Sequence, residues 1–299
     1  MLKNQKNAYI YAISSTLLWS TVAVGFKISL QYMDFIQLLF ISSLVSVIIL
    51  ISVLVYRNEF KLLFSCTKKQ YLNSAFLGFL NPFAYYMVLL KAYSVLPAQL
   101  AQPLNYTWPI VLVLLSAPLL KQKLKAKSLL AFLISFTGVY FIASSNHIFN
   151  FKIEQPFGIF LASASSLIWA LFWIFNIKDS RPEILKLALS FTFSLFFTII
   201  AMFFFSEFKT PEFKGILAAT YIGFFEMGFT FILWLMALQF ADRSDTISNL
   251  VYISPFLSLI WIHLVLKENI YETTILGLIF IVIGIFVQQY KFKTKKNNG

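Results

Sequence analysis

The sequence has few of the residues that build disulfides or metal centres. Cys66 is the only cysteine, so the chain cannot close an internal disulfide. His147 and His263 lie far apart, and with a single cysteine they argue against a zinc site. No P-loop pattern occurs, which argues against nucleotide hydrolysis. We therefore expect no metal and no cofactor.

Charged residues are scarce as well. They make up 12% of the positions, against about a quarter in soluble domains. The hydrophobic share is 59% and includes 35 phenylalanines, a composition that favours lipid over water. The net charge of +12 would suit nucleic acid, but the basic residues lie in short clusters between apolar runs rather than along one face. The composition predicts an integral membrane protein that contacts lipids and binds no nucleic acid.

Ten apolar runs are long enough to cross a hydrocarbon core about 30 Å thick. They cover about residues 8–30, 35–55, 71–91, 97–119, 128–145, 156–176, 185–206, 215–240, 245–266 and 272–290. Strands of a membrane barrel would alternate polar and apolar residues, which these runs do not, so we expect helices. The first run is longer than the apolar part of a signal peptide, about 7–15 residues, and we interpret it as a retained helix.

The basic residues predict the orientation, because cytoplasmic loops carry the excess of lysine and arginine. With the N-terminus inside, eighteen basic residues fall in cytoplasmic segments and five in outer ones. Lys27 is the remaining one and is expected to snorkel toward the outer interface, with the attraction of a carboxylate substrate as the alternative. We therefore expect a multi-pass protein of the cytoplasmic membrane with both termini in the cytoplasm.

The chain also repeats itself at a nearly constant offset of 145 to 150 residues. The matched pairs are Trp19 with Trp169, LGF (77–79) with IGF (222–224), Tyr106 and Pro109 with Tyr252 and Pro255, KQKL (121–124) with KENI (267–270), and Gly138 with Gly284. Each half holds five predicted helices, so the second half must enter the membrane from the opposite side. The sequence predicts an all-α membrane protein of ten helices in two inverted five-helix repeats, residues 1–148 and 149–299, an arrangement typical of transporters.

Several motifs resemble a known family. LLWST (17–21), LNYTWP (104–109), LIWALFW (167–173) and KEN (267–269) together resemble the drug/metabolite transporter superfamily, EamA-type, over essentially the whole chain. NYTWP is most similar to the aromatic amino acid exporter branch. The resemblance implies a central cavity lined by helices 1, 3, 4, 6, 8 and 9 and the transport of amino acids or similar metabolites. The family's usual glutamate after helix 4 is replaced by Gln122, whereas Glu268 is kept after helix 9.

One carboxylate lies deep inside a predicted helix. Glu226 falls near the middle of helix 8, and its repeat counterpart in helix 3 is Asn81, beside Pro82. An ionisable group at this depth costs at least about 2.5 kcal/mol and by default marks a site or a pathway. We expect Glu226 to bind a substrate amino group, a proton, or both, with Asn81 at the same depth. The alternative is a structural carboxyl satisfied by a neighbouring helix, for example by a lysine.

Aromatic and amide side chains also fall within the predicted helices rather than only at their ends. The candidates for substrate binding are Trp19, Asn105, Tyr106, Trp108, Trp169, Trp173, Trp234 and Tyr252. Tryptophan and tyrosine normally gather at the membrane surface, and several of these lie too deep for that belt. Together they favour an aromatic-walled pocket, against the alternative of plain helix packing.

Pro109 and Pro255 each follow a tyrosine by three residues. A proline inside a helix removes a backbone donor and bends the helix, which membrane proteins tolerate beside a cavity. The two prolines are therefore candidate hinges around the pocket. A static kink is the alternative.

The sequence thus predicts a secondary transporter that moves a small organic metabolite by alternating access. An amino acid is the first candidate, including an aromatic one, and protons are the candidate coupling ion. Other solute classes remain open: a drug, a nucleotide-like compound or a sugar-derived metabolite. An integral membrane enzyme is disfavoured because Glu226 has no evident catalytic partner, and a channel is the third alternative.

Overall fold

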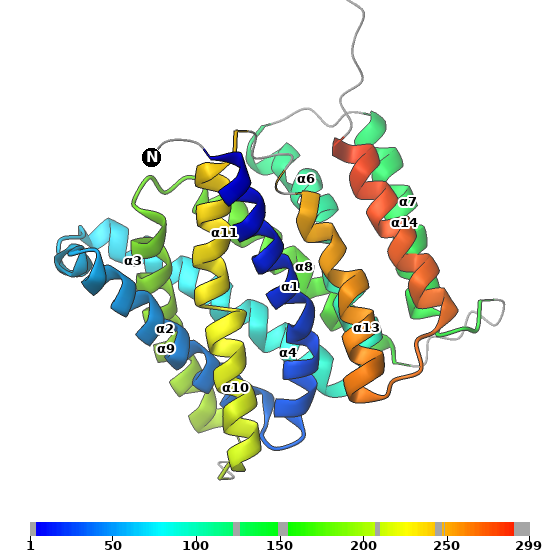
Figure 1. The fold of residues 1–299 in the computed structure, drawn as a ribbon, viewed down its shortest axis with the longest axis horizontal. Coiled ribbons are helices and arrows are strands. Elements are labelled where there is room, and N and C mark those ends of the chain that lie inside the picture. Colours follow the sequence, from blue (N-terminus) through cyan, green and yellow to red (C-terminus); the bar gives the residue numbers. More distant parts are fainter. Residues whose placement is uncertain are drawn as a thin grey trace, which may run out of the picture.

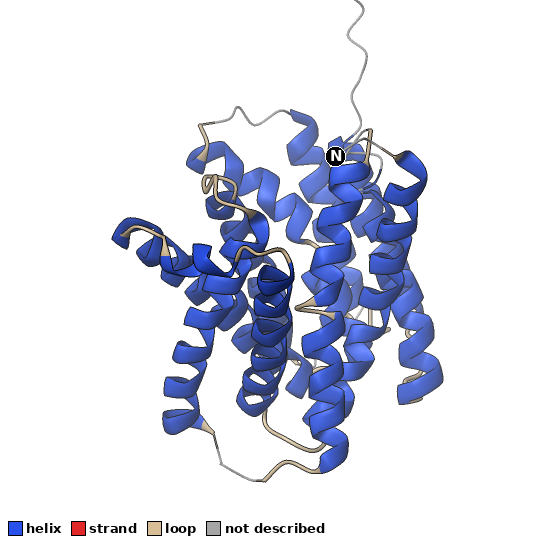
Figure 2. Ribbon diagram, turned by 60° about the vertical axis from the view of Figure 1, so that its left-hand side comes forward, coloured by secondary structure: helices blue, strands red, loops and turns tan. Residues whose placement is uncertain are grey.

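The computed structural model describes residues 4–121, 126–148, 155–206, 210–242, 247 and 249–289. Within them the chain forms ten helical spans of membrane-crossing length. These described residues contain no strand (Figure 2). The fold class is therefore confirmed. Six spans are continuous: α1 (Gln5–Leu30), α2 (Phe35–Tyr56), α7 (Ala126–Ala143), α8 (Pro156–Asn176), α9 (Glu183–Phe205) and α14 (Glu272–Gln289).

The other four spans are interrupted, and they are the third and fourth span of each half. The third consists of α3 (Lys68–Gly78), the wider turns of η2 (Phe79–Ala84) and α4 (Tyr85–Val95), and the fourth of α5 (Ala98–Asn105) and α6 (Trp108–Leu119). The eighth consists of α10 (Phe213–Phe225) and α11 (Phe229–Phe240), and the ninth of η3 (Asn249–Ile253) and α13 (Ser254–Leu266). A short 3₁₀ helix, η1 (Phe60–Phe64), follows α2.

Local sequence explains these breaks. Asn81 takes an extended conformation (φ −147°, ψ 124°) directly before Pro82. Gly228 is the N-cap of α11, and Glu226 ends α10. Pro109 and Pro255 lie in the first turns of α6 and α13, where proline is favoured because its missing N–H has no helical partner there.

The packing of the spans follows the two-fold pattern that the repeat predicts. The first span, α1, packs on α10, α11 and α13 of the second half, and its counterpart α8 packs on α4, α5 and α6 of the first. The second and seventh spans, α2 and α9, pack on each other, and so do α7 and α14, which lie side by side in Figure 1. The spans that line the centre therefore all contact the opposite half.

Two glycines at equivalent positions of the repeat allow close contacts between helices. A Cβ at Gly78 would lie 2.2 Å from the carbonyl oxygen of Ser190, and one at Gly223 would lie 2.5 Å from that of Ser42. Gly78 and Gly223 belong to the matched LGF and IGF segments. Between α7 and α14, Gly138 and Gly277 approach each other's carbonyl oxygens in the same way. Small residues at such crossings let two backbones approach, as is common in membranes.

The two ends of the bundle differ in what they carry. The beginning of α1 and the end of α14 lie at the same end, which we call the terminal end (Figure 1), and the opposite end is the far end. Asn4 donates its backbone N–H to the carbonyl of Phe240, which ties α1 to the close of α11 at the terminal end. Several basic residues used for the orientation, among them Arg243 and Lys291, lie outside the described residues, and the orientation stays a prediction.

Candidate functional site

A cavity of about 310 Å³ lies at the centre of the bundle, between the two halves. Its walls come from α1, α4, α5, α6, α8, α11 and η3, together with the residues at the breaks. Nine of the ten residues that the sequence proposed for substrate binding line it: Trp19, Asn105, Tyr106, Trp108, Trp169, Trp173, Glu226, Trp234 and Tyr252. The structure thus brings together residues that are up to 233 positions apart in the chain.

Glu226 contributes the carboxylate of this cavity. It stands at the break between α10 and α11, half-buried, where one carboxylate oxygen accepts a hydrogen bond from the hydroxyl of Tyr86 at 2.9 Å. Its backbone carbonyl accepts a long hydrogen bond from the indole N–H of Trp19 at 3.5 Å. No lysine or arginine in the described part of the chain forms an ion pair with it. The lysine partner of the structural alternative is therefore not found there.

The aromatic side chains form a connected wall. Trp19 contacts Trp234 with ring centroids 5.4 Å apart and Phe231 with centroids 5.9 Å apart. The wall continues from Phe231 to Trp169 at 6.2 Å, and from Trp169 to Tyr85 at 4.6 Å and to Trp173 at 5.9 Å. Since α1, α4, α8 and α11 all contribute, both halves share this wall.

The amide of Asn105 is held in place by two neighbours. Its oxygen accepts a hydrogen bond from Tyr85 at 3.1 Å, and its nitrogen donates to the hydroxyl of Ser165 at 2.8 Å. On the other half, Tyr252 accepts a hydrogen bond from the side chain of Gln289 at 2.8 Å. Preorganised groups of this kind fix the orientation of a bound ligand without reorganisation.

Asn81 is the exception among the ten residues. It lies at the break of the third span, as Glu226 does in the eighth, but it does not line the cavity. Its side chain is 1% exposed, and neither its amide oxygen nor its amide nitrogen has a hydrogen-bond partner in the described structure. Asn81 and Glu226 thus each lie at the interruption of their span, but Asn81 is not in the cavity wall.

The prolines lie beside the cavity without lining it. Pro109 follows the cavity residues Tyr106 and Trp108, and Pro255 follows Tyr252. Each proline begins the second segment of its span after a short break, so it starts a helix rather than bending one in its interior. The two halves place this interruption at the same point of the fourth and ninth spans. Movement at these points stays a hypothesis.

The cavity is closed at the far end. Phe26, Tyr86 and Tyr93 are at most 2% exposed, and the rings of Phe26 and Tyr93 meet with centroids 5.1 Å apart. Toward the terminal end the lining reaches Ile177, which is 69% exposed. The cavity therefore extends toward the end that carries both termini.

Beyond these aromatic residues, toward the far end, lie three polar residues that we call the far-end latch: Lys27, Gln99 and Glu268. Glu268 accepts hydrogen bonds from the backbone N–H groups of Ala98 (2.9 Å) and Gln99 (3.2 Å), so it caps the N-terminus of α5. The side chain of Gln99 bonds the carbonyl of Asn269 and the N–H of Tyr271, both at 2.8 Å. The latch thus joins the loop after α13 to the beginning of α5.

Lys27 completes the latch from α1. Its ammonium donates to the carbonyls of Tyr93 and Leu96, both at 3.0 Å, where α4 ends. The expected reach of Lys27 toward the outer interface stays a prediction. The structure adds that carbonyls at the C-terminus of α4 hold its ammonium at the far end, where a cation is favoured.

The sequence reasoning missed Tyr85, Tyr86 and Gln102. Tyr85 and Gln102 line the cavity, and Tyr86 binds Glu226. The pair Tyr85–Tyr86 follows Pro82 within the same span as Asn81, so its depth was available from the sequence. Gln102 lies in the stretch before LNYTWP, at a depth where an unpaired amide is costly.

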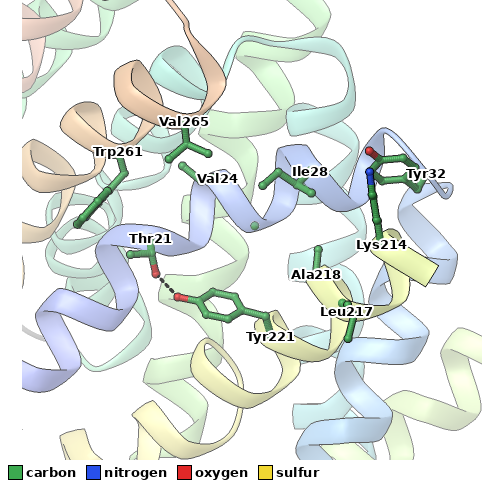
Figure 3. A pocket seen from close by; sticks show the side chains of 11 residues that line it. Thr21, Val24, Ile28, Tyr32, Lys214, Leu217, Ala218, Tyr221, Trp261 and Val265 are labelled. Atoms are coloured by element: carbon green, nitrogen blue, oxygen red, sulfur yellow. Dashed lines mark hydrogen bonds between the residues drawn. The ribbon is translucent and has the colours of Figure 1, made fainter. Parts of the chain in front are cut away.

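A second hollow, a groove of about 470 Å³, lies between α1, α10 and α13 (Figure 3). It includes Trp261 and Val265, which are 40% and 50% exposed, so it opens at the surface of the bundle. The hydroxyl groups of Thr21 and Tyr221 form a hydrogen bond across it at 2.5 Å. We assign the candidate site to the smaller central cavity, because the groove contains none of the predicted residues and is walled almost entirely by apolar side chains.

Comparisons with known proteins agree on the class. The EamA-like transporter family matches residues 6–144 and 156–288. An uncharacterized transporter of Clostridium kluyveri is 26% identical and covers 98% of this chain and 96% of its own length. The uncharacterized transporter YoaV of Bacillus subtilis is 23% identical, with 95% of this chain and 97% of that protein covered.

A solved crystal structure resembles the fold with a TM-score of 0.68 at 19% identity, covering 96% of this chain and 97% of that chain. At this identity the likeness supports the fold alone. Neither of the two relatives has a substrate in its name, so the aromatic amino acid exporter branch stays a prediction.

Proposed function

This chain belongs to the EamA-like transporter family, and from that premise we propose that it moves a small organic metabolite across the cytoplasmic membrane by alternating access. The first candidate among substrates is an amino acid, including an aromatic one. The central cavity is the proposed binding site, and the terminal end is the proposed cytoplasmic end. Protons are the proposed coupling ion.

The observation that supports this proposal most directly is the cavity between two halves that share one packing pattern. It is closed at the far end by aromatic rings and extends toward the terminal end. Because the halves are inverted copies, exchanging their conformations would close the terminal end and open the far one. A cavity closed at one end suits a carrier better than an open channel.

The lining also bears on the rival functions. A nucleotide-like or phosphorylated substrate would require cations, and the described lining contains neither lysine nor arginine. A membrane enzyme would require several convergent catalytic groups, and Glu226 is the only carboxylate in that lining. Glu226 is therefore better placed to bind an amino group or carry a proton than to catalyse a reaction.

The test is flux in liposomes that contain the purified protein, with a panel of amino acids and other metabolites, with and without a pH gradient. We expect saturable uptake, counterflow in preloaded vesicles, and weaker coupling to the pH gradient for Glu226→Gln. Flux that does not saturate and shows no counterflow would indicate a channel. An impermeant reagent should label neither terminus in intact cells and both termini after permeabilisation, and labelling of either terminus in intact cells would contradict the orientation.

A further inference from the structure

Resting on the proposed function, we propose that the cavity selects organic amines that carry no carboxylate: monocations with an aromatic or apolar body. The amine would pair with Glu226, and the body would lie against the tryptophan wall. Within the proposed class of small organic metabolites, this moves the first candidate from amino acids to amines that lack the carboxylate.

The first argument is charge. Among the described residues that line the cavity, Glu226 is the only acid, and there is no lysine, arginine or histidine. An amine would find one opposite charge. A zwitterionic amino acid would bring a carboxylate as well, and burying that group without a cation costs free energy that the amine-only analogue avoids.

Lys27, which approaches the closed end, does not supply the missing charge. Its ammonium donates to the backbone carbonyls of Tyr93 and Leu96, and Lys27 is not part of the cavity wall. Recruiting it for a substrate carboxylate would require breaking both contacts and uncapping α4. The ammonium of Lys27 is thus already engaged by backbone carbonyls of the protein.

The second argument is the use of the polar donors around the cavity. The hydroxyls of Tyr85 and Tyr86 donate to Asn105 and Glu226. The indole N–H of Trp19 points to the backbone carbonyl of Glu226. These three donors are engaged by acceptors of the protein, whereas the indole N–H of Trp173 has no partner in the described structure. A substrate carboxylate, which accepts several hydrogen bonds when buried, would find such a neutral donor but no cation in the described lining.

The third argument is the aromatic wall itself. Trp19, Trp169, Trp173 and Trp234 line the same hollow as Glu226, and Trp19 and Trp234 are in ring contact. Indole faces attract cations, most strongly where water is excluded. A wall of indoles around one carboxylate therefore favours a cation over both a neutral compound and an anion.

The cavity volume sets the size. About 310 Å³ corresponds to roughly ten water molecules at about 30 Å³ each. An arylethylamine, with on the order of ten non-hydrogen atoms, fits this volume.

The experiment compares four compounds that share one indole body: tryptamine, tryptophan, indole-3-propionate and tryptophol. Counterflow is measured with the full-length protein in liposomes. We expect the transport efficiency for tryptamine to exceed that for tryptophan by about tenfold or more, since one charge-assisted hydrogen bond is worth about that factor. Indole-3-propionate should not be transported, and tryptophol only weakly.

Glu226→Gln should lower tryptamine transport by about tenfold or more and bring it close to that of tryptophol. Tyr221→Phe is the control, because it removes one polar group from the groove between α1, α10 and α13 and leaves the central cavity intact. Its tryptamine transport should be unchanged. Circular dichroism and thermal unfolding of each variant show that the fold is kept.

The outcomes separate this inference from the proposed function. If tryptophan is transported as efficiently as tryptamine or more so, the proposed transport function is supported and the proposed preference for amines is wrong. If Glu226→Gln transports tryptamine normally, the assignment of Glu226 is wrong. If none of the four compounds moves, thermal stabilisation of the purified protein by tryptamine but not by indole-3-propionate still supports the inference, and its absence overturns it.

Discussion

The two halves of the chain share a backbone plan but differ in chemistry at equivalent points. The third and eighth spans are both interrupted near mid-depth, yet the first interruption places a buried, unpaired Asn81 outside the cavity and the second places Glu226 in it. The inverted repeat therefore explains the frame of the site, whereas the difference between the halves explains what the site recognises.

The same contrast recurs after the fourth and ninth spans. Glu268 caps the N-terminus of α5 and is part of the far-end latch, while Gln122 occupies the matched position of the first half, outside the described residues. A carboxylate at a helix N-terminus is stabilised by the helix dipole, and a neutral amide gains less.

The largest expected effect tests the shared frame. Gly78→Ala and Gly223→Ala should each destabilise the protein by about 3 kcal/mol, although alanine normally favours a helix over glycine. The reason is that a Cβ at either position would lie within 2.5 Å of a carbonyl oxygen of the opposing helix. Chemical unfolding in detergent measures the effect.

Gly25→Ala is the control for these two variants. A Cβ there would first meet a side-chain atom of Ile222 at 3.2 Å, which can move aside. Its stability should change by less than about 1 kcal/mol. Equal losses of stability in the Gly78 and Gly223 variants would support equivalent helix packing in the two halves. A loss in only one variant would show that the two halves pack differently.

The second prediction tests the difference between the interruptions. Asn81→Ala should leave transport within about twofold and stability unchanged or slightly raised, because it removes two buried polar atoms that have no partner. Glu226→Ala should lower transport about tenfold or more and leave the hydroxyl of Tyr86 without its acceptor. Flux and thermal unfolding of the two variants are measured side by side. Equal losses of transport would show that Asn81 shares the role of Glu226.

The third prediction concerns the far-end latch. Glu268→Gln should weaken the cap of α5 by about 1 kcal/mol and so raise the population with an open far end by roughly fivefold. A Cys66→Ser background with Leu89→Cys, which lies in the cavity wall, allows labelling by an impermeant thiol reagent added from the far side. Glu272→Gln, in the first turn of α14, is the control and should leave the labelling rate unchanged. An unchanged labelling rate for Glu268→Gln would show that the far-end latch does not control the opening of the far end.

The sequence allowed most of the frame to be predicted, because hydropathy, basic loops and the repeat are each local or periodic signals. Hydropathy located all ten spans within a few residues, and the matched tyrosine–proline pairs marked two of the four interruptions. It could not show which side of an interrupted span faces the centre, because an extended residue such as Asn81 or a cap such as Glu226 leaves the helical period. Asn81 was therefore misplaced, and Tyr85 and Tyr86, a few residues away, were missed.

Lys27 shows the same limit at the far end. A lysine near the end of a span is normally expected to snorkel, and only the fold brings the carbonyl groups that close α4 within its reach. Contacts between chain segments of this kind leave no local pattern. The composition of the cavity could be predicted, whereas the hydrogen bonds that hold its far end closed could not.

The smallest expected effect concerns the prolines that begin α6 and α13. Pro109→Ala and Pro255→Ala each restore a backbone N–H that can donate to the carbonyl four residues earlier, at Asn105 and Val251. Each would favour one continuous helix over two segments. We expect the stability to change by less than about 1 kcal/mol, since alanine is well tolerated in a first turn. Turnover should fall a few-fold while the apparent affinity stays the same, because the cavity wall keeps its side chains.

Steady-state flux at several substrate concentrations separates these two quantities. Pro118→Ala, near the end of α6 and away from the interruption, is the control and should leave turnover unaffected. If turnover is unchanged in both proline variants, the interruptions before α6 and α13 are static. The helices must then bend at other points when the conformation changes. If only one variant slows, the two halves bend unequally, and the asymmetry seen at Glu226 and Glu268 extends to the movement itself.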